Sequence, residues 1–337
     1  SAISRTFEQT MALGRIVKAN NPNVFLFMGG QHATEDPNTV LEIFDAAVRY
    51  EGDFTFPEIL ERVAEHNQRP DLEGILGISF KNGNGIVHAP KRNFLTKEEL
   101  SALPFPIFSQ TTLRHITHNV IVTSRGCPFD CEFCSVIQNF GQEFRYRDDD
   151  STIALIKYHK KLAPGLPFFF GDDIFNSNPG RLKRVLDRIL REGIKMPQWA
   201  AQIRHEASKD PELLQLMKRT NGYIMFIGLE SVNDKTLEIY KKHATMEKNR
   251  EALRKIRKAG LLAHGMFVIG SDVDTPRTIE DTLRFARQEC DTAQFFSLTP
   301  IIGTPQGTDL QTKGQIITEG FTHHDAITAV ISPLNLT

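Results

Sequence analysis

Residues Ser124 to Ser135 read SRGCPFDCEFCS and contain three of the four cysteines in this 337-residue chain. Three residues and then two residues separate the clustered thiols, which are Cys127, Cys131 and Cys134. Cys290, the fourth cysteine, lies far away along the chain. Gly126 and Pro128 indicate a turn, so the three thiols are predicted to lie on a loop.

Three clustered thiols are compatible with few kinds of site. A disulfide framework does not suit them, because one thiol would stay unpaired. A structural zinc site needs four ligands, usually as two separated pairs, and the second pair is missing unless Cys290 and a histidine join. Three closely spaced thiolates on a loop suit an iron–sulfur cluster, in which one iron would stay open to a small molecule. We favour this interpretation over zinc or inert cysteines, and we expect Cys290 to be a small buried hydrophobic residue.

The overall composition excludes several classes of protein. Lys and Arg number 40 against 41 Asp and Glu, a net charge of -1 that gives no electrostatic case for nucleic-acid binding. No stretch approaches the roughly 20 apolar residues that a transmembrane helix needs. Free thiols predict a reducing, cytoplasmic setting. From its abrupt first and last residues we expect the chain to be a fragment of a longer protein.

The first hundred residues alternate between helical and strand-like patterns. We predict a helix at 7–19, a buried strand at 23–30, helices at 38–48 and 56–66, and a hairpin at 74–90 with Asn-Gly turns. The sequence before residue 7 is predicted to hold the end of a strand. Residues 95–108 contain two prolines and are predicted to be a linker.

From residue 119 onwards the pattern becomes a regular alternation of strands and helices. Six strands are predicted, at 119–123, 167–172, 198–203, 223–228, 264–270 and 293–298. One intervening helix has its apolar residues on a single face: Leu182, Val185, Leu186, Ile189 and Leu190. Helix starts are predicted at Pro211, at Pro276 and after Asn233. Six βα units form a barrel or partial barrel, with chemistry at the carboxyl ends of the strands. The cysteine loop follows the first of these strands.

These residues resemble the radical S-adenosylmethionine (SAM) superfamily. The resemblance is carried by the three cysteines and by four later stretches: GDDIF (171–175), WAAQIRHEASKDPELLQLMKRTNG (199–222), MFIGLES (225–231) and LTPIIGTP (298–305). In the first part, QHATEDP (31–37) and YEGDFTFPEIL (50–60) are similar to two loops of the cobalamin-binding domain in one branch of that superfamily.

The resemblance implies an α/β fold in which a partial Rossmann-like domain of the cobalamin-binding type precedes a partial (β/α)6 radical SAM barrel. The implied domains are 1–100 for the cobalamin-binding type, 101–118 for a linker, 119–310 for the barrel and 311–337 for a C-terminal extension.

The resemblance also implies the cofactors of the barrel. Cys127, Cys131 and Cys134 would hold a [4Fe-4S] cluster whose open iron binds SAM, and one electron would then split the sulfonium bond. The implied SAM-binding residues are Phe133, Asp172, Asp173, Gln202, Arg204 and Glu230. One of the two aspartates would bind the ammonium group of SAM, Arg204 its carboxylate and Gln202 its ribose. Glu230 would pair with Arg204 or with a ribose hydroxyl, and the alternative is a purely structural ion pair. For Arg204 the alternative is a surface salt bridge. Phe129 and Phe133 would shield the cluster, stack near adenine, or only pack the loop.

For the first domain the resemblance implies cobalamin binding by residues at strand ends, namely Ser4, Thr6, Gly29, Gly30, His32, Glu51 and Gly52. His32 would face the cofactor or its tail, although a histidine at such a position is more often a solvated loop residue. The chain lacks an Asp-x-His-x-x-Gly stretch, which would supply a histidine ligand to cobalt.

The implied function is enzymatic modification of an unactivated carbon in a small-molecule, lipid-like or tetrapyrrole-like substrate. The reaction would be cobalamin-dependent methyl transfer or an oxidative or cyclising rearrangement, with electrons from a flavodoxin-type or ferredoxin-type donor. The alternatives are a cobalamin-independent radical SAM enzyme and a non-catalytic iron–sulfur carrier or sensor. An RNA-modifying methylthiotransferase would need more cysteines and a basic surface.

Overall fold

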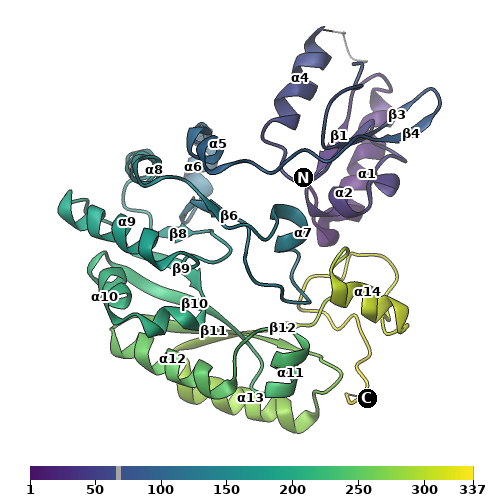
Figure 1. Cartoon of the computed structure of the whole chain (residues 1–337). Helices are drawn as coiled ribbons and strands as arrows, with labels where there is room; N and C mark the ends of the chain where they lie inside the picture. Colours follow the sequence, from purple (N-terminus) through teal and green to yellow (C-terminus); the bar gives the residue numbers. More distant parts are fainter. Residues whose placement is uncertain (66–69, 337) are drawn as a thin grey trace. The chain divides into compact units, whose positions relative to one another are not determined.

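The computed structural model describes residues 1–65 and 70–336. The chain forms two compact units (Figure 1). The first unit contains Ser1–Phe94, Glu132–Gly141 and Ser297–Ser332, and the second contains Leu95–Cys131, Gln142–Phe296 and Pro333–Thr337. His66, the last residue of a predicted helix, lies outside the described residues. The domain limits predicted from the sequence remain predictions.

The second unit is built on a six-stranded sheet in the order β12-β11-β10-β9-β8-β5. The strands are β5 (Asn119–Ile121), β8 (Phe168–Phe170), β9 (Trp199–Ile203), β10 (Gly222–Glu230), β11 (Leu262–Ile269) and β12 (Thr292–Ser297). Neighbouring strands from β5 to β11 run parallel. All six predicted strands are confirmed, in sequence order across the sheet, with β5 and β12 at its two edges. This α/β arrangement agrees with the predicted fold class.

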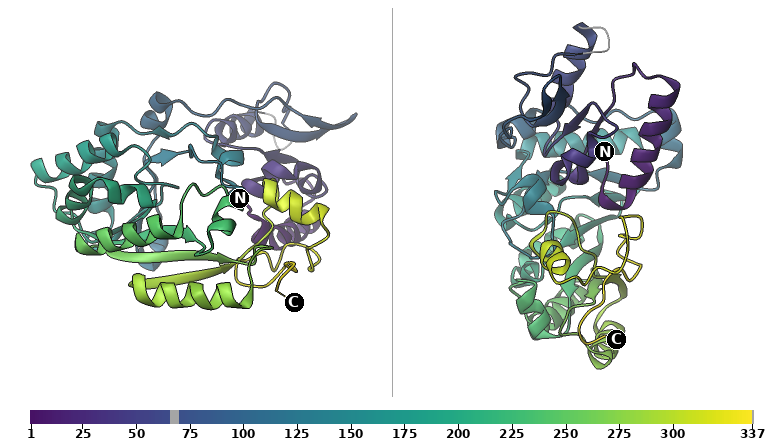
Figure 2. Two further views of the ribbon diagram at one scale, coloured as in Figure 1. Left: turned by 60° about the horizontal axis from the view of Figure 1, so that its bottom comes forward. Right: turned by 90° about the vertical axis from the view of Figure 1, so that its right-hand side faces the viewer.

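Helices cover one face of this sheet (Figure 2). They are α8 (Asp149–Leu162), α9 (Pro179–Arg191), α10 (Pro211–Arg219), α11 (Asp234–Ile239), α12 (Met246–Lys258) and α13 (Pro276–Glu289), with the 3-10 helix η1 (His205–Lys209). The predicted apolar face of α9 packs into the main hydrophobic core. The predicted helix starts are also confirmed, because the side chains of Asp210, Thr275 and Asn233 each accept a backbone N–H at the first turn.

The segment before β5 is more regular than the sequence suggested. It contains α5 (Lys97–Ala102) and α6 (Gln110–His115). Thr96 and Glu99 form a capping box that starts α5. A two-stranded ribbon of β6 (Ser124–Arg125) and β7 (Arg145–Tyr146) lies on the two sides of the cysteine-containing segment. The linker interpretation missed α5, because its two prolines follow the helix rather than interrupt it.

The first unit contains a four-stranded sheet in the order β1-β2-β3-β4. Its strands are β1 (Phe27–Gly29), β2 (Ala46–Val48), β3 (Ile78–Asn82) and β4 (Gly85–His88), and its helices are α1 (Ser4–Asn20), α2 (Gln31–Glu35), α3 (Pro37–Val40), α4 (Thr55–Glu65), α7 (Val136–Phe140) and α14 (Pro305–Thr312). β1 and β2 are parallel, whereas β3 and β4 form the predicted hairpin. Side chains of β2 alternate between two cores, so helices cover both faces as in a Rossmann-like layer.

Two predictions for this unit were wrong. Residues 38–48 were predicted to be one helix, but α3 ends at Val40 and β2 begins at Ala46. β2 is buried on both faces, and a short apolar run of that kind cannot be told from a helix by periodicity. Ser4 and Thr6 were expected at the end of a strand, but they lie in the first turn of α1.

The segment 297–332 packs on α1 and α2 within the first unit. The Glu8 carboxylate accepts a hydrogen bond from the Phe321 backbone N–H at 2.6 Å and another from the Thr322 hydroxyl. The Phe321 ring lies with its centroid 4.7 Å from that of His32. None of the helices in the described part of the chain is long and apolar enough to span a membrane.

Candidate functional site

The cysteine loop (residues 126–135) connects β6 of the second unit to α7 of the first. Cys127 is buried, and its burial raises the pKa of its thiol, while Cys131 and Cys134 are half-buried. The chain passes between the two units after Cys131. Because three residues of chain reach at most about 11 Å, Cys134 must stay near Cys131. None of the four cysteines forms a disulfide, and the described residues include no preformed group of three or more metal-ligating side chains.

A buried carboxylate, Asp172, holds the strand that leads into this loop. One of its oxygens, Oδ1, accepts hydrogen bonds from the Thr123 backbone N–H at 3.1 Å, the Thr123 hydroxyl at 3.0 Å and the Ser124 hydroxyl. Burial raises the pKa of Asp172, and these three donors oppose that shift. Asp172 follows β8 directly, so it joins the ends of two neighbouring strands.

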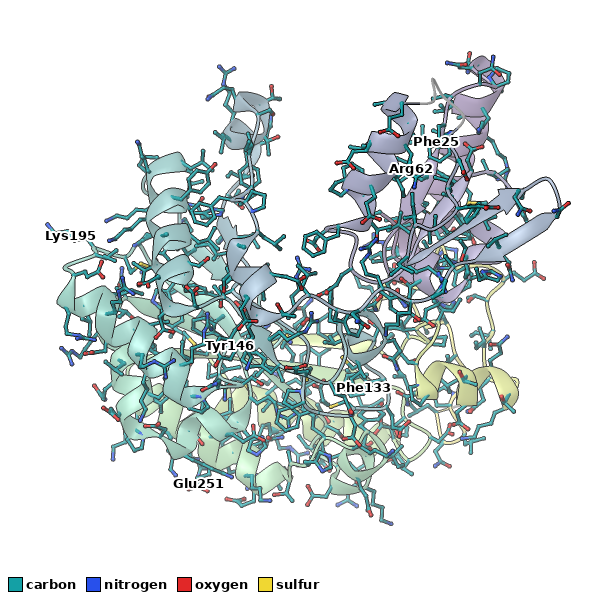
Figure 3. All side chains as sticks on the ribbon, turned by 45° about the horizontal axis from the view of Figure 1, so that its top comes forward. Phe25, Arg62, Phe133, Tyr146, Lys195 and Glu251 are labelled. Atoms are coloured by element: carbon teal, nitrogen blue, oxygen red, sulfur yellow. The ribbon has the colours of Figure 1, made fainter. Side chains whose placement is uncertain are left out.

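Arg181 supplies the positive charge for this carboxylate. It lies in the first turn of α9 and is almost fully buried. Its guanidinium donates to the hydroxyls of Thr123 at 3.3 Å and Thr152 at 2.9 Å, and it lies 5.0 Å from the ring centroid of Tyr146, a residue labelled in Figure 3. The Thr123 hydroxyl therefore links the two residues, because it donates a hydrogen bond to Asp172 and accepts one from Arg181.

Asp173 differs from its neighbour. It is only partly buried, and burial together with the charge of Asp172 raises its pKa to about 6. A carboxyl group of this kind becomes ionised more easily when a cation lies beside it. Of the two predicted aspartates, Asp173 is therefore the one whose environment suits an ammonium group, whereas Asp172 is engaged in holding the strand ends.

Arg204, just after β9, contacts the cysteine loop directly. It is 4% exposed, and its guanidinium lies 3.6 Å from the ring centroid of Phe129, between Cys127 and Cys131. Its nitrogens donate to the Glu206 carboxylate at 3.2 Å and to the Lys242 carbonyl at 2.7 Å. Arg204 is thus buried against the loop and is not part of an exposed salt bridge.

Glu230 ends β10 with a positive φ of 62°. Its carboxylate forms a buried ion pair with Lys242 Nζ at 2.7 Å. Arg204 was the wrong partner for Glu230, and the observed pair with Lys242 agrees with the alternative of a structural ion pair. Gly228 makes room for the pair, since a Cβ there would lie 2.5 Å from Glu230 Oε1 and 2.9 Å from Lys242 Nζ.

The face of the six-stranded sheet opposite the helices is mainly apolar. Gln202 is exposed on this face, in register with Phe226 of β10. Phe226 and Phe169 meet edge to face with centroids 5.8 Å apart, and Val120 of β5 is also exposed. Phe133, labelled in Figure 3, lies in the cysteine loop two residues before Ser135, the N-cap of α7.

The predicted cobalamin residues belong to the first unit, most of them at or near the ends of β1 and β2. Gly29 ends β1, and Gly30 follows with a φ of 109°, where a Cβ would lie 2.6 Å from the Ala2 carbonyl oxygen. Glu51, which is buried, and Gly52 follow β2. At Gly52 a Cβ would find only Val48, at 3.4 Å.

His32 is not a solvated loop histidine. It is fully buried in α2 and stacks on Phe7 with ring centroids 3.7 Å apart. Its Nδ1 lies 3.4 Å from the Ser4 hydroxyl, whereas Thr6 caps α1 by accepting from the Ile3 backbone N–H. Burial lowers the pKa of His32 to about 4, so the ring is neutral at ordinary pH. His32 and Ser4 therefore pack the interior of this unit.

The sequence analysis missed Arg181 and Lys242, and also an aromatic pair in the first unit. Lys91 Nζ lies 4.1 Å from the Tyr50 ring centroid and 4.0 Å from that of Phe94. No local signal reveals Arg181 or Lys242, because their partners lie in other segments, and Tyr50 is likewise distant in sequence from Lys91. Cys290 was predicted correctly, since it follows α13, packs against the main core and has its pKa raised by burial to about 11.

The raised pKa of Asp173 predicts a specific pH dependence of stability. The stability that this group contributes is fully present below its ordinary pKa of 3.8 and is lost as the pH rises through about 6. Urea denaturation should therefore show Asp173→Asn gaining stability relative to the wild type between about pH 4 and pH 7. Asp187→Asn, at a more exposed aspartate of α9, is the control and should not gain in this way. Parallel pH curves for Asp173→Asn and the wild type would contradict the assignment.

Comparison with known proteins shows the family to which this chain belongs. Residues 121–286 match the family model described as the Radical SAM superfamily. The chain is 30% identical over 316 residues to "Uncharacterized methyltransferase PH0819" of Pyrococcus horikoshii, covering 90% of this chain and 67% of that protein. It is 25% identical over 331 residues to the anaerobic magnesium-protoporphyrin IX monomethyl ester cyclase of Cereibacter sphaeroides, covering 94% of this chain and 53% of the cyclase.

A similar fold is found in a solved structure. The cobalamin-dependent S-adenosylmethionine radical enzyme OxsB, with aqua-cobalamin and S-adenosylmethionine bound, superposes with a TM-score of 0.79 at 16% identity, covering 99% of this chain and 55% of that chain. The chain thus spans between half and two thirds of the lengths of these proteins. Its cysteine loop, its parallel sheet and its matched residues make this chain a member of the radical SAM superfamily of enzymes.

Proposed function

We propose that this chain is the catalytic part of a cobalamin-dependent radical SAM enzyme that modifies an unactivated carbon of an apolar substrate. The reaction is methyl transfer or an oxidative or cyclising rearrangement. The observation that carries the proposal is that two features occur in one chain. A loop with three cysteines follows the first strand of the six-stranded sheet, and in the first unit glycines lie at or after the ends of two parallel strands. A cytoplasmic setting and a flavodoxin-type or ferredoxin-type electron donor belong to the same proposal.

Membership of the superfamily gives the enzyme SAM and a [4Fe-4S] cluster as cofactors. The donor set fits the cluster, because Cys127, Cys131 and Cys134 lie on one short loop and form no disulfide, whereas Cys290 packs against the core. When bound, the cluster supplies the electron for reductive cleavage of SAM.

The residues at the strand ends have complementary roles in binding SAM. Asp173 accepts hydrogen bonds from the ammonium group, and Arg204 holds the carboxylate through a guanidinium already fixed by Phe129 and Lys242. Gln202 binds the ribose from the exposed face of β9, and Glu230 supplies a further acceptor. Phe133 covers the adenine side of the loop.

The apolar sheet face supports an apolar substrate. Val120, Phe169 and Phe226 give this face an apolar surface on which an apolar substrate would bind. The cyclase relative is named for a magnesium-porphyrin ester, which is a large, mostly apolar ring. We therefore assign a tetrapyrrole-like or lipid-like substrate class to this chain.

Cobalamin fits part of the first unit. Gly52 has open space beside its backbone after β2, whereas Gly30 packs closely against Ala2 after β1, and ligands of open α/β sheets bind at such strand ends. His32 does not fit as a ligand to cobalt, because it is enclosed by Phe7 and Phe321. Cobalamin binding here thus depends on close backbone contact and not on this imidazole.

The cluster assignment predicts a clear pattern among four variants. Cys127→Ala, Cys131→Ala and Cys134→Ala should each lose bound iron and sulfide after anaerobic reconstitution, because each removes a thiolate ligand. Cys290→Ala should retain both, since its thiol packs against the core. Iron and acid-labile sulfide assays on the full chain measure the result. Loss of iron in Cys290→Ala alone would overturn the ligand set.

Corrinoid retention tests the cobalamin assignment. Gly52→Leu is the informative variant, because its backbone tolerates a side chain without strain, whereas Gly30 has a positive φ and a carbonyl oxygen in the way. Protein from a cobalamin-supplied host should carry about one corrinoid per chain, and Gly52→Leu should lose it while staying folded.

Gly83→Leu is the matched control, since a Cβ at this hairpin glycine meets nothing within 4 Å. This variant should retain corrinoid like the wild type. If the wild-type chain holds the cluster and cleaves SAM but never retains corrinoid, the enzyme is cobalamin-independent. The proposal of cobalamin-dependent methyl transfer is then wrong.

A further inference from the structure

Lys242 lies in an unusual turn between α11 and α12. Its neighbours Lys241 and His243 both have positive φ, at 49° and 55°. Strained backbone of this kind persists only where the surrounding contacts fix it. Lys242 itself is 6% exposed, and a lysine is almost never buried to this extent unless it is paired.

The side chain of Lys242 has one strong partner. Its Nζ lies 2.7 Å from Glu230 Oε1, and both side chains are buried. Removing one member of such a pair leaves an uncompensated buried charge, which is far more costly than removing both. Glu230 at the end of β10 therefore depends on Lys242 for its position.

The backbone of Lys242 contacts a second strand end. Its carbonyl accepts a hydrogen bond from Arg204 Nη2 at 2.7 Å, and Arg204 covers the ring of Phe129. The same turn also contacts the cysteine loop at two other points. The Lys241 carbonyl lies 3.9 Å from Cys131 Sγ, and His243 Nε2 lies 2.9 Å from Asp130 Oδ1. This turn thus contacts Asp130 and Cys131 of the cysteine loop directly, and it contacts Phe129 through Arg204.

We propose that Lys242 is a positioning residue for the SAM site, a role that rests on the proposed function. Its ammonium group fixes Glu230, and its carbonyl sets the Arg204 guanidinium on Phe129. Glu230, Lys242, Arg204 and Phe129 form a continuous path of contacts from β10 through the turn and β9 to the cysteine loop. Lys242 touches neither SAM nor the cluster and acts through these neighbours.

The test compares Lys242→Met with Lys241→Met in the anaerobically reconstituted full chain. Methionine keeps the length of the side chain and removes the charge. Lys241 is the matched control, because its side chain is exposed and the substitution leaves its backbone carbonyl in place. Iron content, SAM affinity by equilibrium dialysis and the electron paramagnetic resonance spectrum of the reduced cluster, with and without SAM, are measured for each.

We expect Lys242→Met to hold wild-type iron but to bind SAM at least about tenfold more weakly, with a diminished SAM-induced change in the spectrum. Lys241→Met should match the wild type in all three measurements. Wild-type SAM affinity and an unchanged spectral response in iron-loaded Lys242→Met would overturn the proposal.

A second variant decides the matter if Lys242→Met fails to hold iron. Phe129→Leu interrupts the same path at the loop and keeps an apolar side chain there. It should weaken SAM binding and alter the SAM-induced spectral change, and wild-type behaviour would overturn the proposal. A wild-type chain that holds iron and binds no SAM would instead overturn the proposed function, and this role with it.

Discussion

The buried carboxylate of Asp172 fixes the point at which the chain leaves the sheet for the cysteine loop. Three donors from Thr123 and Ser124 converge on one of its oxygens, and Arg181 provides the opposite charge through the shared Thr123 hydroxyl. A buried charge is tolerated only when it is paired and hydrogen-bonded, so these groups must stay together. Cys127, the first of the three thiols, lies three residues after Ser124, so these hydrogen bonds fix the point at which the cysteine loop begins.

The other strand ends follow the same physical rule. Glu230 is paired with Lys242, and Arg204 is satisfied by Glu206, a backbone carbonyl and an aromatic ring. Each of these buried groups thus has its partners in place, and groups held in this way need little reorganisation when a ligand binds. Asp173 is the exception, because its burial is not offset and its pKa is raised to about 6, which makes it responsive to an incoming cation.

Much of this architecture could be predicted from local patterns. The six strands are short apolar runs separated by amphipathic helices with clear caps, and the cysteine spacing marks the loop. β2 was missed because burial on both faces removes the alternation that identifies a strand. Lys242 was missed because its role depends on a strained turn and on partners in other segments. Likewise, no sequence pattern indicates that segment 297–332 packs against α1, where Glu8 binds its backbone.

The central claim is that these strand ends and the cysteine loop bind SAM for reductive cleavage. Chromatographic detection of 5′-deoxyadenosine from the anaerobically reconstituted chain, given SAM and a reductant, tests it most directly. The account predicts that 5′-deoxyadenosine forms with the wild type and not with a chain that lacks the Cys134 thiol. A chain that holds its full iron content and binds SAM, yet yields no 5′-deoxyadenosine under reducing conditions, would contradict it.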